Sequence, residues 1–125
     1  LTGLSILLVE DNVFNAVVAQ DQLEDFIDQA KVVVAQNGEI AVKKVKENNF
    51  DVILMDVQMP IMNGYDATKA IRQLSGDKAK TPIIAMTANV LKEEVALCYD
   101  AGMDDFIGKP FDPEVLIQKI ATLTQ

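Results

Sequence analysis

Acidic side chains, a threonine and a lysine follow four short apolar runs in this 125-residue chain, and their types fit phosphoryl transfer. Glu10 and Asp11 follow one run, Asp56 follows a second, and Thr87 and Lys109 follow two later ones. Carboxylates hold hard divalent cations, while an ammonium group and a hydroxyl can bind phosphoryl oxygens. A carboxylate is also a competent nucleophile towards an activated phosphoryl donor. This chemistry requires a fold that brings the five residues together.

Alternating strands and helices would position these residues. Runs that are apolar on both faces predict four buried strands, with a weaker fifth: residues 6–9, 32–35, 52–55, 83–86 and 105–107. Apolarity on both faces is typical of a parallel sheet that helices cover on either side. Helical periodicity and position predict five helices between and after the strands: residues 13–28, 39–48, 67–74, 90–101 and 116–123.

Residues that favour helix ends stand at suitable places: Asn12 and either Thr87 or Asn89 before helices, Gly102 after one, and Pro113 in a first turn. Residues 75–81 are predicted to form a polar loop. The segment 26–30 lacks a glycine between the first helix and the second strand, which leaves the boundary there open.

This alternation predicts an α/β fold. We expect a flavodoxin-like, doubly wound (βα)5 domain, whose five-stranded parallel sheet has the order 2-1-3-4-5. Ligands of such sheets bind beyond the carboxyl ends of the strands, where the strand order reverses. Here that point lies between the first strand, which precedes Glu10 and Asp11, and the third, which precedes Asp56.

The acidic residues at this point have a structural and a functional interpretation. A single carboxylate ahead of a helix stabilises the helix dipole, which would suffice for Asp11 alone. Three together differ, because two such charges about 4 Å apart repel by roughly 4 kcal/mol at an effective dielectric of 20. Lys109 offsets one charge, and the surplus indicates an oxygen-liganded divalent ion, for which Mg²⁺ with retained waters is best suited. Asp56, at the end of the central strand, is the candidate nucleophile.

The overall charge and the cysteine count restrict partners and location. Eleven Lys and Arg residues stand against nineteen Asp and Glu, and a formal charge of −8 repels nucleic acid. A single cysteine, Cys98, excludes an internal disulfide and favours the cytoplasm. The apolar runs are too short to span a membrane, so we expect no membrane contact by this domain, although a parent protein could be membrane-anchored.

Two further features of the sequence bear on its context. The chain contains no histidine, so any phosphohistidine must come from another protein or another domain. It begins at Leu1 and not at Met, which suggests that residues 1–125 are a single domain excised from a longer chain.

The motifs around these residues resemble a known family. They are Leu-Val-Glu-Asp-Asn at Glu10, Leu-Met-Asp-Val-Gln-Met-Pro-Ile-Met-Asn-Gly-Tyr at Asp56, Ala-Met-Thr-Ala-Asn at Thr87, and Lys109 with Pro110. This ordered set resembles the receiver domains of response regulators over the whole chain, and is most similar to receivers of hybrid sensor histidine kinases. The resemblance implies a phosphorelay domain that takes a phosphoryl group from a histidine kinase transmitter or a histidine phosphotransfer protein. By itself it would be a phosphoacceptor with self-dephosphorylation, and not an enzyme.

The resemblance also implies a metal site. Asp56 would be the phosphoacceptor and would ligate Mg²⁺ together with Asp11 and the backbone carbonyl of Gln58. Glu10 would act on the ion through a water molecule.

Phosphoryl oxygens would be held by other groups. The resemblance assigns them to Thr87 and Lys109, with the backbone amides of Gln58 and Ala88. It also implies a cis peptide bond before Pro110, where proline lowers the cis penalty to about 1 kcal/mol.

Further roles follow from the same resemblance. Phe106 would be a mobile aromatic ring that turns inward when Thr87 moves towards the phosphoryl group, or else a plain core residue. Gln58 and Asn89 flank the path of an attacking water and would tune the lifetime of the phosphorylated state. Phe14 is either core or part of an apolar patch that docks a phosphodonor helix, and we favour docking.

Three other functions compete with a phosphoacceptor role. A phosphatase with an aspartyl nucleophile would place a second Asp where Gln58 stands. A flavodoxin-like cofactor binder would need a Gly, Ser or Thr loop where Glu10 and Asp11 would repel a phosphate. A receiver-like interaction module that works without phosphorylation is the third, and it fits poorly with an intact Asp56 and Lys109.

Overall fold

The predicted α/β architecture is present in the computed structural model, which describes residues 2–124. The strands are β1 (Ser5–Val9), β2 (Lys31–Ala35), β3 (Val52–Asp56), β4 (Ile83–Thr87) and β5 (Asp105–Gly108). The helices are α1 (Val13–Phe26), α2 (Gly38–Glu47), α3 (Gly64–Arg72), α4 (Lys92–Ala101) and α5 (Pro113–Thr124), with a 3₁₀ helix, η1 (Gly76–Lys80). The strands form one sheet in the order β2-β1-β3-β4-β5, and every neighbouring pair is parallel. This confirms the predicted fold class and strand order.

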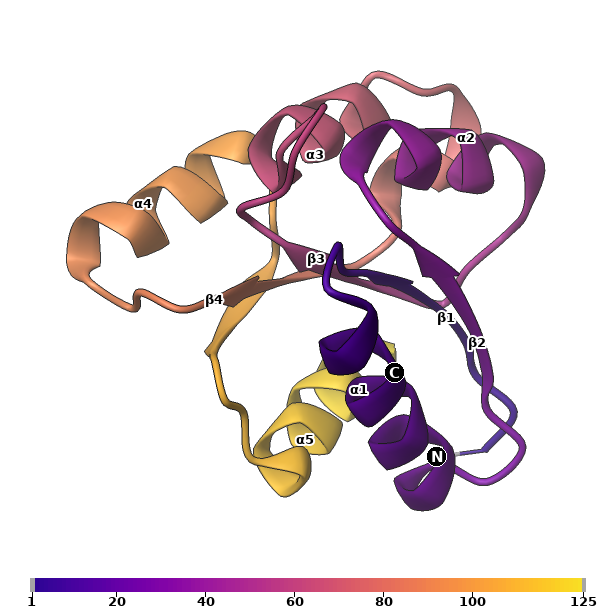
Figure 1. Cartoon of the computed structure of the whole chain (residues 1–125). Coiled ribbons are helices and arrows are strands. Elements are labelled where there is room, and N and C mark those ends of the chain that lie inside the picture. Colours follow the sequence, from indigo (N-terminus) through magenta and orange to yellow (C-terminus); the bar gives the residue numbers. More distant parts are fainter. Residues whose placement is uncertain (1, 125) are drawn as a thin grey trace.

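Helices cover both faces of the sheet. Figure 1 shows α2, α3 and α4 on one face and α1 and α5 on the other. Successive strand residues point to opposite faces, so Leu7 belongs to the core beneath α2 and α3, whereas Leu8 packs with α1 and α5. Both faces therefore bury apolar side chains, each of which stabilises the fold by about 1.5–3 kcal/mol when fully buried.

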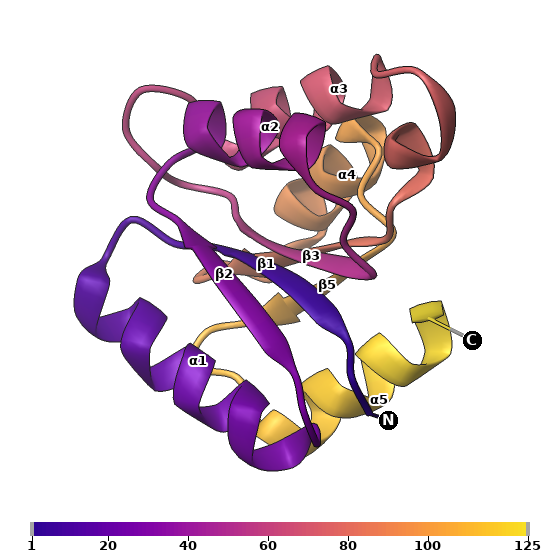
Figure 2. The same cartoon turned by 90° about the vertical axis from the view of Figure 1, so that its right-hand side faces the viewer.

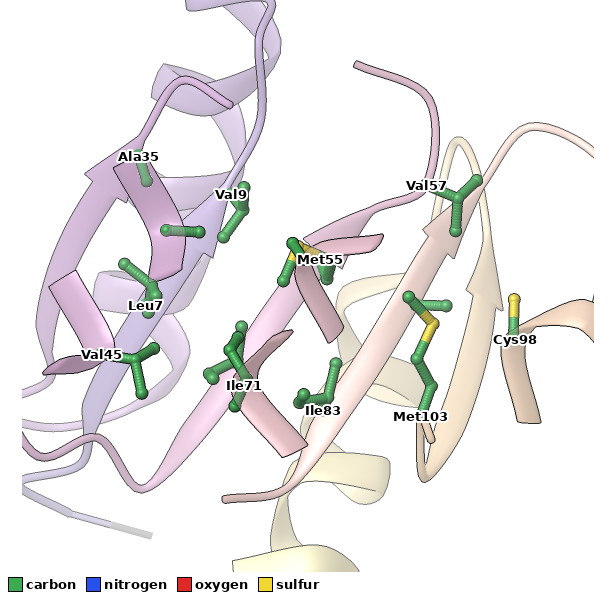
Figure 3. Packing of buried hydrophobic residues seen from close by; sticks show 14 residues of the cluster. Leu7, Val9, Ala35, Val45, Met55, Val57, Ile71, Ile83, Cys98 and Met103 are labelled. Carbon is green, nitrogen blue, oxygen red and sulfur yellow. The ribbon is translucent and has the colours of Figure 1, made fainter. Parts of the chain in front are cut away.

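The larger core lies between the sheet and the three helices of one layer. In Figure 3, side chains of neighbouring strands extend towards Val45 of α2 and Ile71 of α3. Cys98 of α4 is buried in the same core, where it packs as a small apolar side chain. β3 and β4 are buried at every residue, which explains why their sequences are apolar on both faces.

Local signals fixed several helix ends as expected. The Asn12 side chain accepts a hydrogen bond from the Asn15 amide at the start of α1, and α5 begins at Pro113. Gly102 ends α4 with a φ of 108°. The open boundary after α1 is also settled, because α1 ends at Phe26 and Gln29 adopts a φ of 58° where a glycine is usual.

The predicted start of α4 was wrong. The helix begins at Lys92, and neither Thr87 nor Asn89 caps it within the described residues. Instead, the Asn89 side chain accepts a hydrogen bond from the Leu91 amide at 3.0 Å, and the Thr87 hydroxyl bonds to the backbone of Asn89. The side chains predicted as caps therefore stabilise a turn that precedes the helix.

The stretch predicted as a polar loop contains η1. Two long side chains hold it in place. Lys78 Nζ donates to the carbonyls of Val45 and Asn48 at 2.7 Å each, near the end of α2. Arg72 of α3 donates to the Ala79 carbonyl at 2.9 Å. These tertiary contacts order a segment that lacks apolar periodicity.

Over residues 2–124, every helix is too short or too polar to cross a lipid bilayer.

Candidate functional site

The carboxylates predicted to meet do meet at the carboxyl ends of β1 and β3. Val9 pairs with Met55 in the sheet, so Glu10 and Asp11 leave β1 beside Asp56, the last residue of β3. One carboxylate oxygen from each of the three acids lies within 4.8 Å of the others. Glu10 and Asp56 are buried, with 4% and 5% of their surfaces exposed, whereas Asp11 is exposed. The site is thus a crevice with two buried acids and one at its mouth.

Lys109 lies among these acids. Its Nζ atom is 2.8 Å from Glu10 Oε1 and 3.0 Å from Asp56 Oδ2. Burial by itself would lower the pKa of Lys109, but hydrogen bonds with Glu10 and Asp56 outweigh burial and raise that pKa. The ammonium group therefore stays charged. The peptide bond between Lys109 and Pro110 is cis, as the resemblance implied.

One cation does not balance this crevice. With Glu10, Asp11 and Asp56 ionised and Lys109 protonated, the four groups carry a net charge of −2. Buried carboxylates are stable only with close cationic or hydrogen-bonding partners. The crevice therefore has the charge and the oxygen donors to take up a small divalent cation.

The segment after β3 supplies a backbone donor to Asp56. The Gln58 amide lies 3.2 Å from Asp56 Oδ1, while the Gln58 side chain extends into solvent. The segment closes on itself, because the Gly64 amide donates to the Val57 carbonyl at 3.1 Å. A Cβ atom on Gly64 would lie 2.4 Å from the Asp56 carbonyl oxygen, so only glycine fits there. Gly64 was not among the predicted site residues, and the Asn-Gly pair is the only sign of this role in the sequence.

Thr87 reaches the same edge of the sheet but its hydroxyl faces its own loop. Met86 pairs with Asp56 in the sheet, which places Thr87 one residue beyond the phosphoacceptor candidate. The Thr87 hydroxyl donates to the Asn89 carbonyl and accepts from the Asn89 amide, both at 3.0 Å. Ala88, between them, is exposed. The one proton of the hydroxyl is thus donated within this turn and not to the crevice.

Comparison with known proteins assigns the chain to a family. Residues 6–121 match the family of response regulator receiver domains. The chain belongs to this family. It is a receiver domain of the two-component phosphorelay, and the family match lends no support to a phosphatase or a flavodoxin-like cofactor binder.

Relatives of this receiver domain include very long proteins. It is 43% identical over 107 residues to hybrid signal transduction histidine kinase G of Dictyostelium discoideum, covering 86% of the domain and 3% of the kinase. It is 39% identical to sensor protein GacS of Pseudomonas syringae pv. syringae, covering 95% of the domain and 13% of GacS. The chain thus spans a small fraction of these relatives. The expected similarity to receivers of hybrid kinases is confirmed.

Solved structures with the same fold come from similar proteins. One is the receiver domain of a sensor histidine kinase from Pseudomonas aeruginosa, with a magnesium ion coordinated in its active site cleft. Its TM-score is 0.89 and its identity 36%, over 98% of each chain. Another contains the Saccharomyces cerevisiae histidine phosphotransfer protein Ypd1 with the receiver domain of Ssk1. The TM-score is 0.86 and the identity 29%, over 97% of this chain and 88% of that one.

Phe106 of this receiver domain lies half-buried on β5. Its ring meets Tyr99 of α4 edge-to-face, with centroids 6.3 Å apart, and Lys119 Nζ lies 5.4 Å from its centroid. The ring also packs against the core under α4. It is therefore wedged between α4 and α5, where a change of rotamer would alter the surface of both helices.

Phe14 is exposed at the start of α1. It is therefore not a core residue, which was the alternative to a docking residue. Its side chain is 75% exposed, and Val18 on the next turn is also exposed. Both line a groove of about 370 Å³ that extends to Lys109 and Phe111. The groove joins the apolar surface of α1 to the acidic crevice, so a molecule bound in it would touch the site.

Proposed function

We propose that this receiver domain accepts a phosphoryl group on Asp56 from a phosphohistidine donor, with Mg²⁺ bound in the same crevice. The observation that carries the proposal is the group of three carboxylates with oxygens within 4.8 Å of one another, of which Lys109 contacts two. A site built only for stability would not collect more negative charge than its one lysine can offset.

The donor groups of the crevice fit Mg²⁺. Asp11 and Asp56 would hold the ion with their carboxylates, the Gln58 carbonyl would complete the protein ligands, and Glu10 would act through a water. Oxygen donors and retained water are what this ion prefers. When bound, it would neutralise negative charge on the phosphoryl oxygens. The magnesium in the cleft of the Pseudomonas aeruginosa relative supports this assignment.

The side chains and backbone amides of the crevice carry out the transfer itself. An Asp56 carboxylate oxygen attacks phosphorus, the new P–O bond replaces the P–N bond to the donor imidazole, and the imidazole leaves with that electron pair. Lys109 keeps its proton and stabilises the phosphoryl oxygens. The amides of Gln58 and Ala88 donate to the same oxygens. Thr87 joins them once its hydroxyl leaves Asn89.

The phosphodonor must be another protein or domain, because this chain has no histidine. We propose a histidine kinase transmitter or a histidine phosphotransfer protein, docked on α1 at Phe14. The complex of Ypd1 with a receiver supports this class of partner. The charge of −8 argues against direct nucleic acid binding.

The wider context of the domain is also a proposal. We infer that this domain is one unit of a hybrid histidine kinase and acts in the cytoplasm without touching the membrane, even where its parent is anchored there. The lengths of its kinase relatives support this inference. A full coding sequence without a transmitter region would contradict it.

The Asp56 assignment predicts a simple labelling result. Acetyl phosphate with Mg²⁺ should phosphorylate the wild type, and Asp56→Asn should abolish the label because an amide is not a competent nucleophile. Asp100→Asn, which changes an exposed acid of α4, is the matched control and should be labelled as the wild type is. Phosphate-affinity gels measure the outcome. Equal labelling of wild type and Asp56→Asn would refute the assignment and favour a phosphorylation-independent module.

The metal assignment predicts opposite effects of one substitution in two buffers. In EDTA, Asp11→Asn should raise the free energy of unfolding, because it removes repulsion within the crevice. In Mg²⁺ the wild type should gain about 2.7 kcal/mol at a hundredfold excess over the dissociation constant. Asp11→Asn should lose most of that gain.

Urea unfolding in each buffer measures the free energy of unfolding of both proteins. Asp21→Asn, which changes an exposed acid of α1, is the control. An equal gain in both variants would exclude Asp11 as a ligand.

The lifetime of the phosphorylated state is expected to depend on Gln58 and Asn89. Both side chains are exposed beside the crevice, so shortening them should open the path of the attacking water. Gln58→Ala and Asn89→Ala should therefore lose the label several-fold faster than the wild type. Gln73→Ala, at an exposed site beyond α3, is the control. Decay at the wild-type rate in both variants would remove this role.

The switch assigned to Thr87 and Phe106 predicts motion of one ring. Beryllofluoride, a mimic of the phosphoryl group, should draw the Thr87 hydroxyl away from Asn89 and let Phe106 turn inward, away from Tyr99. Fluorine NMR of fluorophenylalanine-labelled protein should then show a shifted Phe106 signal. The Phe50 signal, from the far side of the core, should stay in place. A Phe106 ring that keeps one rotamer in both states would identify it as a plain core residue.

A further inference from the structure

Ile61 has a backbone conformation that its side chain disfavours. Among the described residues, two that are not glycine have a positive φ: Gln29 at 58° and Ile61 at 70°. A β-branched side chain in this left-handed region is an outlier, because its Cβ and γ carbons crowd the backbone. Asparagine or glycine would be the usual residue there. The choice of isoleucine therefore calls for an explanation outside the loop backbone.

The loop around Ile61 imposes this conformation. The segment from Val57 to Gly64 closes through the hydrogen bond between these two residues. Next to Ile61, the Met62 carbonyl accepts a bond from the Gly38 amide at 3.0 Å, and the Met62 amide donates to Pro60 at 2.8 Å. The loop is thus fixed on both sides of Ile61. A strained residue persists only where its surroundings fix it in this way.

Burial does not compensate for the strain. The Ile61 side chain is 77% exposed, more than any other large apolar residue of the described chain. An exposed isoleucine contributes little to the core, so neither the backbone nor packing accounts for it. Strained residues of this kind are fixed by the structure around them and concentrate at active sites and binding sites.

The position of Ile61 in the fold indicates which partner it could contact. Figure 2 shows the loops after β1 and β3 leaving the same edge of the sheet. Exposed apolar residues gather on the loops and helix starts at this edge: Val13 and Phe14 after β1, Ile61 after β3, and Val90 and Leu91 after β4. These residues form an apolar rim along the edge of the sheet at which Asp56 lies, and Asp56 itself is only 5% exposed. A protein that delivers a phosphoryl group to Asp56 must cover this rim.

We propose that Ile61 is an apolar anchor that holds the phosphohistidine-bearing donor protein over Asp56. The inference rests on the proposed function of Asp56 and extends the donor interface from α1 to the β3–α3 loop. The matching surface of the donor is apolar next to its histidine, because it would bury Ile61 and the other exposed apolar residues of the rim. A small donor enters the crevice without touching the rim, so Ile61 selects between protein and small-molecule donors.

A pair of matched substitutions tests this role. Ile61→Asn and Gln29→Asn each place asparagine at a positive φ, and Gln29 precedes β2, at the opposite end of the sheet from the crevice. The protein donor is a phosphorylated histidine phosphotransfer protein chosen because it labels the wild type. With it, Ile61→Asn should lower kcat/KM about tenfold or more, as loss of an interface anchor does. Gln29→Asn should leave it unchanged, and Ile61→Leu should restore most of it.

Acetyl phosphate separates docking from damage to the site. It should label Ile61→Asn at the wild-type rate, and the urea midpoint of this variant should be no lower than that of the wild type, because asparagine relieves strain. Equal loss with both donors would show that Ile61 shapes the crevice and would overturn the proposal. An unchanged rate with the protein donor would overturn it too. If acetyl phosphate failed to label the wild type, the proposed role of Asp56 as phosphoacceptor would be wrong.

Discussion

Unbalanced charge at the ends of two neighbouring strands is the constraint on which the rest of this structure depends. β1 and β3 are parallel and adjacent, so the acids that follow them cannot avoid one another. Their one cationic partner in the crevice, Lys109, comes from beyond β5 at the far edge of the sheet. The contact between Lys109 and Glu10 therefore joins segments that follow β5 and β1, which β3 and β4 separate in the sheet. The same geometry that weakens the fold creates the chemistry, since the uncompensated charge is what can hold a dication.

Most of the fold was readable from the sequence because one physical signal dominates it. Strands that are apolar on both faces must be covered by helices on both sides, and this left few arrangements to consider. The start of α4 and the existence of η1 escaped for the opposite reason. Asn89 bonds to its own turn, while η1 is held by Arg72 of α3 and by its own Lys78, which donates to the distant carbonyls of Val45 and Asn48. Neither set of hydrogen bonds produces a periodic pattern of apolar residues in the sequence.

The residues of the site were as predictable as the strand order, but their hydrogen bonds were not. Which residues meet followed from the strand ends, because parallel strands bring their carboxyl ends to one edge. How they bond did not follow. The hydroxyl of Thr87 could have pointed into the crevice, and Lys109 could have paired with Asp11; the packed structure directs the first to Asn89 and the second to Glu10 and Asp56. The positive φ of Ile61 was likewise hidden, because isoleucine by itself argues against that conformation.

Helix capping adds a reason why a change at Thr87 would be felt in α4. Side chains accept backbone hydrogen bonds at the starts of α1, α2, α3 and α5, through Asn12, Asn37, Asn63 and Asp112. Such caps stabilise a helix by about 0.5–2 kcal/mol each. Of the five α-helices within residues 2–124, α4 alone begins without one.

The first turn of α4 is held instead by a contact with another helix. Tyr65 of α3 donates from its hydroxyl to Glu94 Oε2 at 2.6 Å. Burial, together with this hydrogen bond, raises the pKa of Tyr65, so the hydroxyl keeps the proton that it donates. α4 is therefore tied to the domain by side chains of its neighbours, Tyr65 on one side and Phe106 on the other, and less by its own backbone. A helix held in this way can shift as a unit when the turn that precedes it rearranges. That turn is the one formed by Thr87 and Asn89, which begins next to the crevice.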